Sequence, residues 1–168
     1  DSLVYDGVNT PVYQVTNVAI AQISGTYFNI KARLYKDLWI NASATTTSGV
    51  YRKGHDSLAQ PLDHIPPTYG RVGLKHDLKK FSSELFTVFN GWKRIKDYSS
   101  SGEDNQIYAT KDGMPAWQIW NINTNYQLTK KLNFSFQIEN IADLNYRYFA
   151  SGISALGRNY IVQARYSF

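Results

Sequence analysis

The sequence lacks the residues and segments on which several classes of protein depend. None of its 168 residues is cysteine, so a disulfide framework and a thiolate metal site are excluded. No apolar run approaches the roughly 18 residues that a transmembrane helix requires, which excludes insertion into a membrane as a helix. Asp1 to Asn9 contain no basic segment followed by an apolar stretch. Because they do not resemble a signal peptide, we expect a mature or truncated chain.

Charged residues are scarce and aromatic residues are abundant. Charged side chains make up 18% of the chain, against about 25% in a typical domain, whereas aromatic residues reach 15%. The mean hydropathy of -0.40 shows that the chain is polar on average. A β-barrel is the one membrane structure that a polar average permits, because half of each strand faces lipid and the other half faces the lumen.

A basic balance alone does not point to a nucleic-acid partner. The net charge is +5, but the lysines are scattered as pairs at turns instead of forming a patch. An RNA-binding sheet would need paired aromatic residues with basic neighbours on one face, and the Asn-rich segments offer little of this. No Gly-rich loop is followed by Lys-Ser or Lys-Thr, so no nucleotide site is expected.

Polar and apolar residues alternate in segment after segment, which is the period of a strand with two different faces. The clearest examples run from Trp120 to Leu128 and from Asn133 to Glu139. The pattern predicts an all-β fold of about seven antiparallel, up-and-down strands. These strands are predicted near residues 18–35, 38–52, 68–78, 81–95, 115–128, 132–141 and 157–168.

Short and long connections alternate along the chain. The short ones are Lys36-Asp37, Lys79-Lys80 and Thr129-Lys130-Lys131, and the long ones cover 53–67, 96–114 and 142–156. In an up-and-down barrel this order places every tight turn at one rim and every long loop at the other. Outer-membrane barrels have this asymmetry, with short periplasmic turns and longer external loops.

Alternation does not say which face points outward, so two architectures stay open. In a transmembrane barrel the apolar face meets lipid, whereas in a soluble, lipocalin-like carrier of small ligands it lines an interior cavity. Aromatic residues near strand ends favour lipid, because such rings form girdles at the headgroup level. Those expected at the two rims are Tyr35, Trp39, Phe81, Tyr126 and Phe134, and Tyr51, Tyr69, Trp92, Trp117 and Tyr160. A fragment with exposed edges also has the option of closing on itself as a small barrel.

The last residues form a pattern of their own. Tyr160, Val162, Tyr166 and Phe168 share one face of a predicted final strand that ends on the last residue of the sequence. This pattern is similar to the C-terminal strand that the barrel-assembly machinery of the outer membrane recognises by strand pairing. We therefore predict a barrel-assembly signal in these residues.

Several local motifs resemble, in order, those of one family. Asn140-Ile141-Ala142-Asp143 with Tyr146, and Gly157-Arg158-Asn159, are similar to motifs around the last two strands of TonB-dependent outer-membrane receptors. Upstream, Ile65-Pro66-Pro67 before Gly70 resembles a strand entry of that family, and Asn17 through Ala21 to Gly25 resembles another. Leu156, Ile141, Ala142 and Tyr27 depart from the common pattern.

The resemblance implies a barrel of roughly 22 strands with a plugged lumen. Residues 1–168 would form the C-terminal part of that barrel, about a third of it, and the plug domain would lie outside this chain. The implied function is the import of a scarce nutrient across the bacterial outer membrane, such as an iron-siderophore complex, haem, a cobalamin or an oligosaccharide. The implied partners are a TonB-type energy-transducing complex, which binds through the plug, the barrel-assembly machinery and outer-membrane lipid. No cofactor and no enzymatic activity are implied.

Candidate ligand-binding residues lie in the long loops. Arg and Tyr side chains recognise anionic, ring-rich ligands such as siderophores, although basic residues at the external rim would equally pair with lipopolysaccharide phosphates. The candidates are Arg52, His55, Tyr98, Tyr108, Arg147, Tyr148 and Arg158, with Lys53 beside them.

Neither a metal site nor a catalytic site is predicted. His55, His64 and His76 have no zinc-site spacing. Glu103 and Asp104 stand together in a loop that is expected to be mobile. Acid–base catalysis instead needs two carboxyl groups held across a substrate. On the polar face of the predicted strands, Asn121, Asn123, Asn125, Gln127, Gln137 and Glu139 are expected to contact the plug or water.

Overall fold

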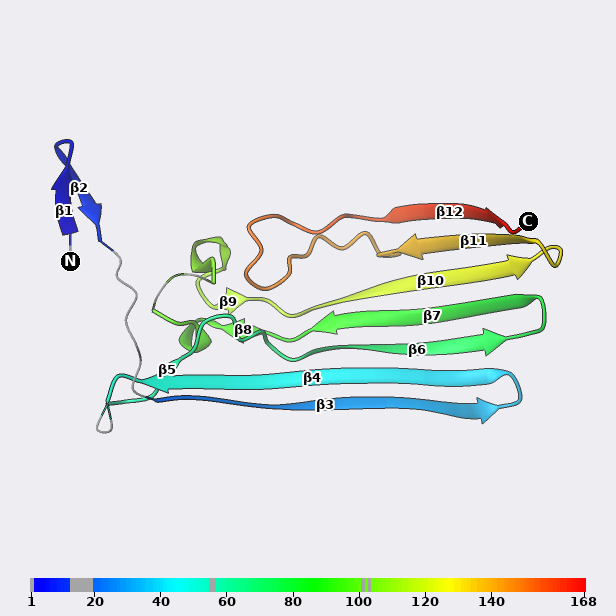
Figure 1. Ribbon diagram of the computed structural model, residues 1–168, viewed down its shortest axis with the longest axis horizontal. Helices are drawn as coiled ribbons and strands as arrows, with labels where there is room; N and C mark the ends of the chain where they lie inside the picture. The colour runs from blue at the N-terminus through cyan, green and yellow to red at the C-terminus, as the bar shows by residue number, and fades with distance from the viewer. Residues whose placement is uncertain (1, 13–19, 55–56, 101, 103) are drawn as a thin grey trace.

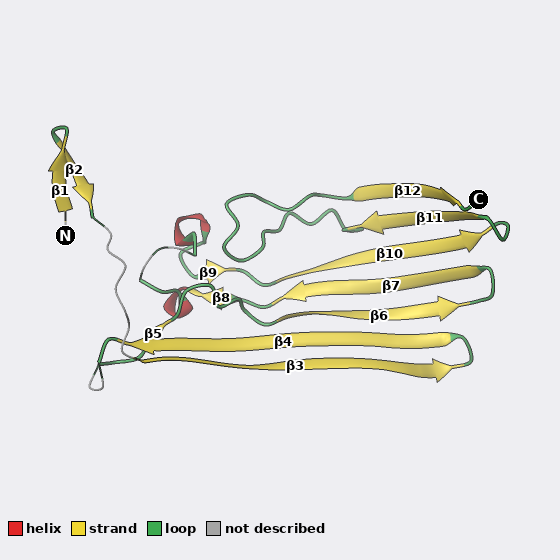
Figure 2. Cartoon of the chain, in the orientation of Figure 1, coloured by secondary structure: helices red, strands yellow, loops and turns green. Residues whose placement is uncertain are grey.

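The computed structural model describes residues 2–12, 20–54, 57–100, 102 and 104–168 of the chain. Its main element is an eight-stranded sheet with the strand order β12-β11-β10-β7-β6-β4-β3, in which the short β5 also pairs with β4. Figures 1 and 2 show the long strands side by side as one open layer. The long strands are β3 (Ile20–Tyr35), β4 (Leu38–Arg52), β6 (Tyr69–Asp77), β7 (Phe81–Asn90), β10 (Trp117–Gln127), β11 (Leu132–Glu139) and β12 (Asn159–Tyr166).

Short elements accompany the sheet. Asp6 and Gly7 both have positive φ angles, of 51° and 75°, which suits the tight turn of a two-stranded hairpin. This hairpin is not among the predicted strands, although Asp-Gly is a known hairpin signal. The short elements are β1 (Ser2–Tyr5), β2 (Val8–Pro11), β5 (Gln60–Pro61), β8 (Lys93–Arg94), β9 (Gly113–Met114) and the 3-10 helices η1 (Ile95–Asp97) and η2 (Gln106–Tyr108). In the described part of the chain, no helix is long and apolar enough to cross a membrane.

The predicted all-β, antiparallel architecture is confirmed, and each predicted strand corresponds to one long strand of the sheet. Some strands end earlier than predicted. The final strand, β12, ends at Tyr166 and not on the last residue, and the prediction of 81–95 runs past the end of β7 at Asn90. Beyond that point Gly91 donates its N–H to the Thr68 carbonyl at 2.6 Å. Lys93 and Arg94 leave the sheet and pair with Gly113 and Met114 instead.

The predicted alternation of connections is also confirmed. The tight turns, at 36–37, 78–80 and 128–131, all lie at the right-hand end of the sheet in Figure 1, where the chain also reaches its C-terminus. The long connections, at 53–68, 91–116 and 140–158, gather at the opposite end. The sheet therefore has a turn rim and a loop rim.

Pairing register separates the side chains into two faces, because residues opposite each other in a ladder point the same way and successive residues alternate. On one face Leu85 lies opposite Ile122, and Ile122 lies opposite Ile138. On the other face Glu84 lies opposite Asn123, which lies opposite Gln137. We call these the apolar face and the polar face. The polar face holds all six predicted polar-face residues, Asn121, Asn123, Asn125, Gln127, Gln137 and Glu139.

The predicted aromatic girdles are only partly present, and they are more complete at the turn rim than at the loop rim, where Tyr160 lies on the apolar face. At the turn rim, Phe81, Tyr126 and Phe134 lie opposite one another on the apolar face. At the loop rim the prediction is wrong for Tyr51, Tyr69 and Trp117, which the register places on the polar face. Trp39 also lies on the polar face, where the Lys31 amine and the Arg33 guanidinium approach its ring. Nearness to a strand end does not specify the face, since one step of register reverses it.

The sheet is open. Among the described residues, β3 pairs only with β4 and β12 pairs only with β11. Closure as a small lipocalin-like barrel, which the sequence left open, is not the arrangement that the structure has. Phe134, Phe136 and Leu128, which would line a carrier's cavity, are 40%, 42% and 45% exposed.

Candidate functional site

The long loops at the loop rim bind one another. The His64 backbone N–H donates to Asp104 Oδ1 at 2.9 Å, and Lys93 Nζ donates to the Ile65 carbonyl at 2.7 Å. Both contacts join connection 53–68 to connection 91–116. Asn105 Nδ2 donates to the Ala150 carbonyl at 2.6 Å, which joins 91–116 to 140–158. We call the described residues of these three connections the loop layer.

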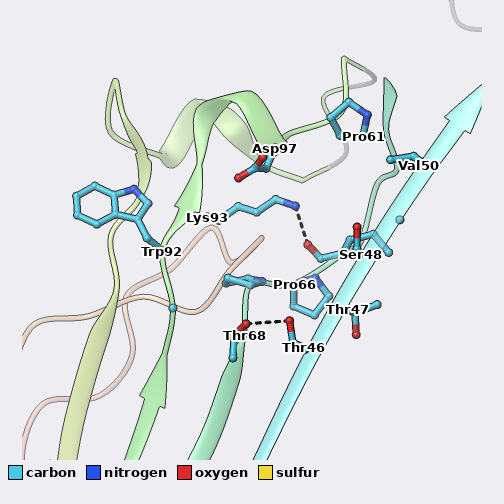
Figure 3. Close-up of a pocket in the computed structure, with 14 residues that line it drawn as sticks. Thr46, Thr47, Ser48, Val50, Pro61, Pro66, Thr68, Trp92, Lys93 and Asp97 are labelled. Atoms are coloured by element: carbon cyan, nitrogen blue, oxygen red, sulfur yellow. Dashed lines mark hydrogen bonds between the residues drawn. The ribbon is translucent and has the colours of Figure 1, made fainter. Parts of the chain in front are cut away.

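A hollow of about 370 Å³ lies between β4 and the loop layer. In Figure 3 the Lys93 side chain extends across it, with Asp97 nearby and with Thr46 and Thr68 below. The hydroxyl of Thr68 donates to that of Thr46 at 3.0 Å. Gly49 of β4 lets the loop approach here, because a Cβ at this position would lie 2.7 Å from Ile65 Cδ1.

Lys93 is a buried cation surrounded by rings and carboxyl groups. Its side chain is only 5% exposed, and its amine lies 5.0 Å from the ring centre of Phe149 and 5.7 Å from that of Tyr98. Burial lowers the pKa of this amine, and the carboxylates of Asp104, Asp97 and Asp63 oppose that shift. Burial also raises the pKa of the Tyr98 hydroxyl, to which the Asp104 charge adds.

Asp104 is the carboxylate at the centre of this cluster. It is 2% exposed, and besides its bond from the His64 N–H its Oδ1 lies 3.4 Å from His64 Nδ1. Asp104 Oδ2 and the Tyr98 hydroxyl have no hydrogen-bond partner among the described residues. The expectation of a mobile loop is therefore wrong for Asp104, because contacts with the 53–68 connection bury it. Glu103 lies outside the described residues.

An aromatic cluster joins the start of β10 to the 140–158 connection. The ring centres of Trp117 and Tyr146 are 4.4 Å apart, and Tyr148 meets Trp117 edge-on at 5.0 Å. The indole N–H of Trp117 donates to the Arg147 carbonyl at 2.9 Å. Burial raises the pKa of Tyr146 to about 12, with further contributions from Tyr148 and Glu139.

Under these tyrosines a second hollow, of about 490 Å³, opens toward the polar face. Its walls come from the sheet and from the 140–158 connection. The residues around it include Phe86, Val88, Ile119, Glu139, Tyr146, Tyr148, Ile153 and Leu156. The hollow is mostly apolar, so it suits a ring or an alkyl group better than a free ion.

The motif residues Asn140, Asp143 and Arg158 tie the last long connection to the sheet. Asn140 is 1% exposed, and its side chain donates to the carbonyls of Leu144 and Leu156 and accepts from the Leu144 N–H. Asp143 accepts from the Arg158 N–H at 2.7 Å, and Arg158 Nε donates to the Ile141 carbonyl at 2.9 Å. The side chain of Arg158 therefore binds its own loop.

The structure brings only some of the predicted ligand-binding residues together. Arg147 Nη1 donates to the Tyr108 carbonyl at 3.3 Å, and the guanidinium lies 5.6 Å from the Tyr108 ring centre. Tyr148 is half-exposed beside them. Tyr98 is buried beneath the loops, Arg52 is exposed at the end of β4, and His55 lies outside the described residues.

The predicted assembly residues lie at the free edge of the sheet. Tyr160, Val162 and Tyr166 share the apolar face of β12 with Ile138, Phe136 and Leu132 of β11. Phe168 follows that strand, and its ring meets that of Tyr166 edge-on at 5.3 Å.

The polar face carries its own charged contact. Arg71 Nη1 lies 2.9 Å from Glu84 Oε1, and the guanidinium stacks 3.9 Å from the ring centre of Phe86. Asn41 donates to the same carboxylate oxygen at 3.4 Å. Gly73 makes room for this pair, since a Cβ there would lie 2.7 Å from Glu84 Oε1. No group of three or more His, Asp or Glu side chains that would hold a metal ion occurs in the described ranges.

The sequence pattern does not reveal Lys93 and Trp117 as organising residues. It predicts a strand at Lys93 and an interfacial girdle at Trp117. No local signal marks a buried lysine, because its partners Ile65 and Phe149 come from distant segments.

Comparison with known proteins gives concordant matches of sequence family and fold. Residues 1–141 match the family model described as TonB dependent receptor-like, beta-barrel. No curated protein matches the chain in sequence. Among solved structures, the copper transporter OprC superposes with a TM-score of 0.71 at 19% identity, over 88% of this chain and 24% of that one.

Two further solved structures are similar. A mutant of the ferric enterobactin receptor PfeA of Pseudomonas aeruginosa has a TM-score of 0.66 at 19% identity, over 98% of this chain and 25% of the other. The ferric-catecholate import receptor Fiu of E. coli K12 has a TM-score of 0.62 at 13% identity, over 97% and 22%. The present chain thus spans about a quarter of each solved chain. Since the family model covers most of its length, the chain belongs to the family of TonB-dependent receptor-like β-barrels.

Proposed function

We propose that residues 1–168 are the C-terminal part of the barrel domain of an outer-membrane receptor that imports a scarce nutrient. The observation that carries this proposal is the division of the sheet into an apolar face and a polar face, with the long loops gathered at one end. A strand layer of this kind crosses a bilayer with its apolar face toward lipid and its polar face toward the lumen.

The remaining strands and a plug domain belong to the rest of the protein in this proposal. The edges of β3 and β12 carry unpaired backbone groups, which further strands would cover. The polar face, with Arg71 and Glu84, would then face the plug. Receptors of this family take their energy from a TonB-type complex, and we propose the same partner here, engaged through the plug.

The proposed substrate is an iron-siderophore complex, ahead of haem, a cobalamin or an oligosaccharide. Two of the similar solved proteins are named for ferric enterobactin and for ferric catecholates. The Arg147–Tyr108 pair and the half-exposed Tyr148 supply a cation beside aromatic rings, which suits an anionic ligand that carries rings. Arg52 and His55 remain candidates at the same rim. Tyr98 and Arg158 act through the loop structure in this proposal, because Tyr98 is buried and Arg158 binds the Ile141 carbonyl.

Two surfaces of the sheet have proposed partners in the membrane. The free edge of β12, with Tyr160, Val162, Tyr166 and Phe168, is the element that the barrel-assembly machinery would pair with. Exposed basic residues at the loop rim, such as Arg52, would also meet lipopolysaccharide phosphates. The proposed role is that of a transporter, and no catalytic residue is assigned.

Uptake by whole cells tests this function. The full-length receptor is expressed in a strain without its own ferric siderophore receptors, and the cells are offered radiolabelled ferric enterobactin with and without a protonophore. We expect accumulation only in energised cells that carry the receptor. The same assay is repeated with haem, a cobalamin and an oligosaccharide. If cells that carry the receptor accumulate none of the four ligands better than receptor-free cells do, the import function is wrong. Uptake of another of these ligands alone would overturn the siderophore assignment.

A further inference from the structure

We infer that Lys93 and Asp104 are positioning residues that hold the three long connections of the loop rim together as one unit. We call this set of contacts the lock. Lys93 belongs to the 91–116 connection and touches both of the others. Its amine donates to the Ile65 carbonyl of 53–68 at 2.7 Å and lies 5.0 Å from the ring centre of Phe149 in 140–158. A single side chain thus joins segments that are far apart in the sequence.

Asp104 and its neighbour Asn105 also join the three loop segments. Its Oδ1 accepts the His64 N–H at 2.9 Å, and the next residue, Asn105, donates to the Ala150 carbonyl at 2.6 Å. Residues 104 and 105, adjacent in the 91–116 connection, therefore bind the 53–68 and the 140–158 connections. Asn105 has a positive φ of 53°, a backbone conformation that Asn tolerates better than most residues.

The charges explain why these contacts act together. A buried charge is costly unless opposite charge and hydrogen bonds surround it. The negative charges of Asp104, Asp97 and Asp63 favour the charged form of the Lys93 amine. Removal of the amine would take a positive charge away from the surroundings of Asp104, which is 2% exposed and would keep only its contacts with His64 among those described. The least costly response is for Asp104 to reach water, which requires the connections to separate.

The lock lies next to the residues that are proposed to meet the ligand. Asn105 is the N-terminal cap of η2, which ends at Tyr108, and Tyr108 accepts the hydrogen bond from Arg147. Phe149, which lies against the Lys93 amine, follows Tyr148. A ligand role for these neighbours rests on the proposed function, whereas the lock itself does not.

Hydrogen–deuterium exchange of the full-length receptor in lipid nanodiscs tests the lock without any ligand. In Lys93→Met, we expect amide exchange at least roughly tenfold faster in all three connections, including 145–152, with no change in β10 and β11. The matched control is Lys96→Met, which removes an exposed amine from the same connection and should leave exchange as it is. Lys93→Arg keeps the charge and should have a smaller effect than Lys93→Met.

A double variant separates a charge lock from ordinary packing. Lys93→Met with Asp104→Asn removes both buried charges, so its loops should exchange more slowly than those of either single variant. If Lys93→Met does not assemble, the comparison of Asp104→Asn with the double variant carries the test. Faster exchange confined to residues around 93, or additive effects in the double variant, would overturn the lock. A failure of nutrient uptake with normal exchange would contradict the proposed function alone.

Discussion

Asn140 shows how one side chain can hold a long connection against the sheet. It stands at the end of β11 with a positive φ of 49°, and its own N–H donates to Asn121 Oδ1 at 2.9 Å. Its side-chain amide satisfies backbone groups of Leu144 and Leu156, which are 4 and 16 residues further along the chain. A buried polar side chain of this kind stabilises because each of its partners would otherwise be left unpaired.

Replacement of Asn140 by alanine should therefore lower the free energy of unfolding by about 3 kcal/mol. The measurement is urea unfolding of the full-length receptor in detergent micelles. Asn140→Asp should also be destabilising, because it keeps the acceptor for Leu144 but loses both donated bonds and buries a charge. Asn145→Ala, at an exposed position of the same connection, is the control, and an equal loss there would refute the anchoring role.

The raised pKa of Tyr146 predicts that the stability of the protein depends on pH. Its pKa is raised from 10.0 to about 12, so folding favours the neutral phenol. The resulting stabilisation is present in full below pH 10 and is lost as the pH rises from about 10 to about 12. The difference in unfolding free energy between the wild type and Tyr146→Phe should be constant below pH 10 and fall above it. A difference that stays constant up to pH 12 would contradict this prediction.

At the scale of elements, a glycine allows three strands to lie close together. Gly70 of β6 pairs with Ala44 of β4 and with Phe89 of β7. A Cβ at this position would lie 2.3 Å from the Ser43 carbonyl oxygen and 2.7 Å from the Phe89 ring. The close approach to a backbone atom leaves little room for adjustment, so the two ladders depend on the absence of a side chain here.

Gly70→Ala should weaken the β4–β6–β7 pairing by about 1–3 kcal/mol, because overpacking displaces the neighbouring strand. The readout is the fraction of full-length receptor that migrates as a folded, heat-modifiable band in unheated detergent gels. Gly54→Ala serves as the control, since among the described residues a Cβ there meets only Ser57 Oγ, at 3.7 Å. An unchanged folded fraction in Gly70→Ala would show that the neighbouring strands can accommodate a side chain at this point, and would contradict the prediction.

At the scale of the whole molecule, the two faces of the sheet define where the chain can reside. The apolar face is continuous from β4 to β12, through pairs such as Leu74 with Leu85 and Phe136 with Val162. The polar face carries Arg71, Glu84 and the Asn side chains of β10. A sheet that buried its apolar face in a pocket would need a second layer over it, and in the described part of the chain those residues stay exposed.

Two neighbouring substitutions in β11 test which face meets lipid. Phe136→Arg places a charge on the apolar face near the middle of the strand and should cost about 2–4 kcal/mol in a bilayer. Gln137→Arg places the same charge on the polar face and should cost much less. Folding of the full-length receptor into liposomes, followed through urea titration, measures both. Equal costs, or a larger cost for Gln137→Arg, would reverse the assignment of the faces.

The amino-acid sequence by itself determined the strands, the tight turns and the existence of two chemically different faces. These features depend on neighbours in the chain, because alternation and turn residues act over a few positions. The motif Asn140 to Asp143 was also visible, although its role as an anchor was not.

Only the tertiary structure decided which aromatic residues lie on which face, and which loop residues are buried. Tyr51, Tyr69 and Trp117 lie on the polar face because of the pairing register, which a position near a strand end does not reveal. Lys93 and Asp104 are buried because segments far apart in the chain meet at the loop rim: Lys93 binds Ile65, 28 residues away, and Asp104 binds His64, 40 residues away. Burial of a charge depends on such distant partners, and a local pattern carries no information about them.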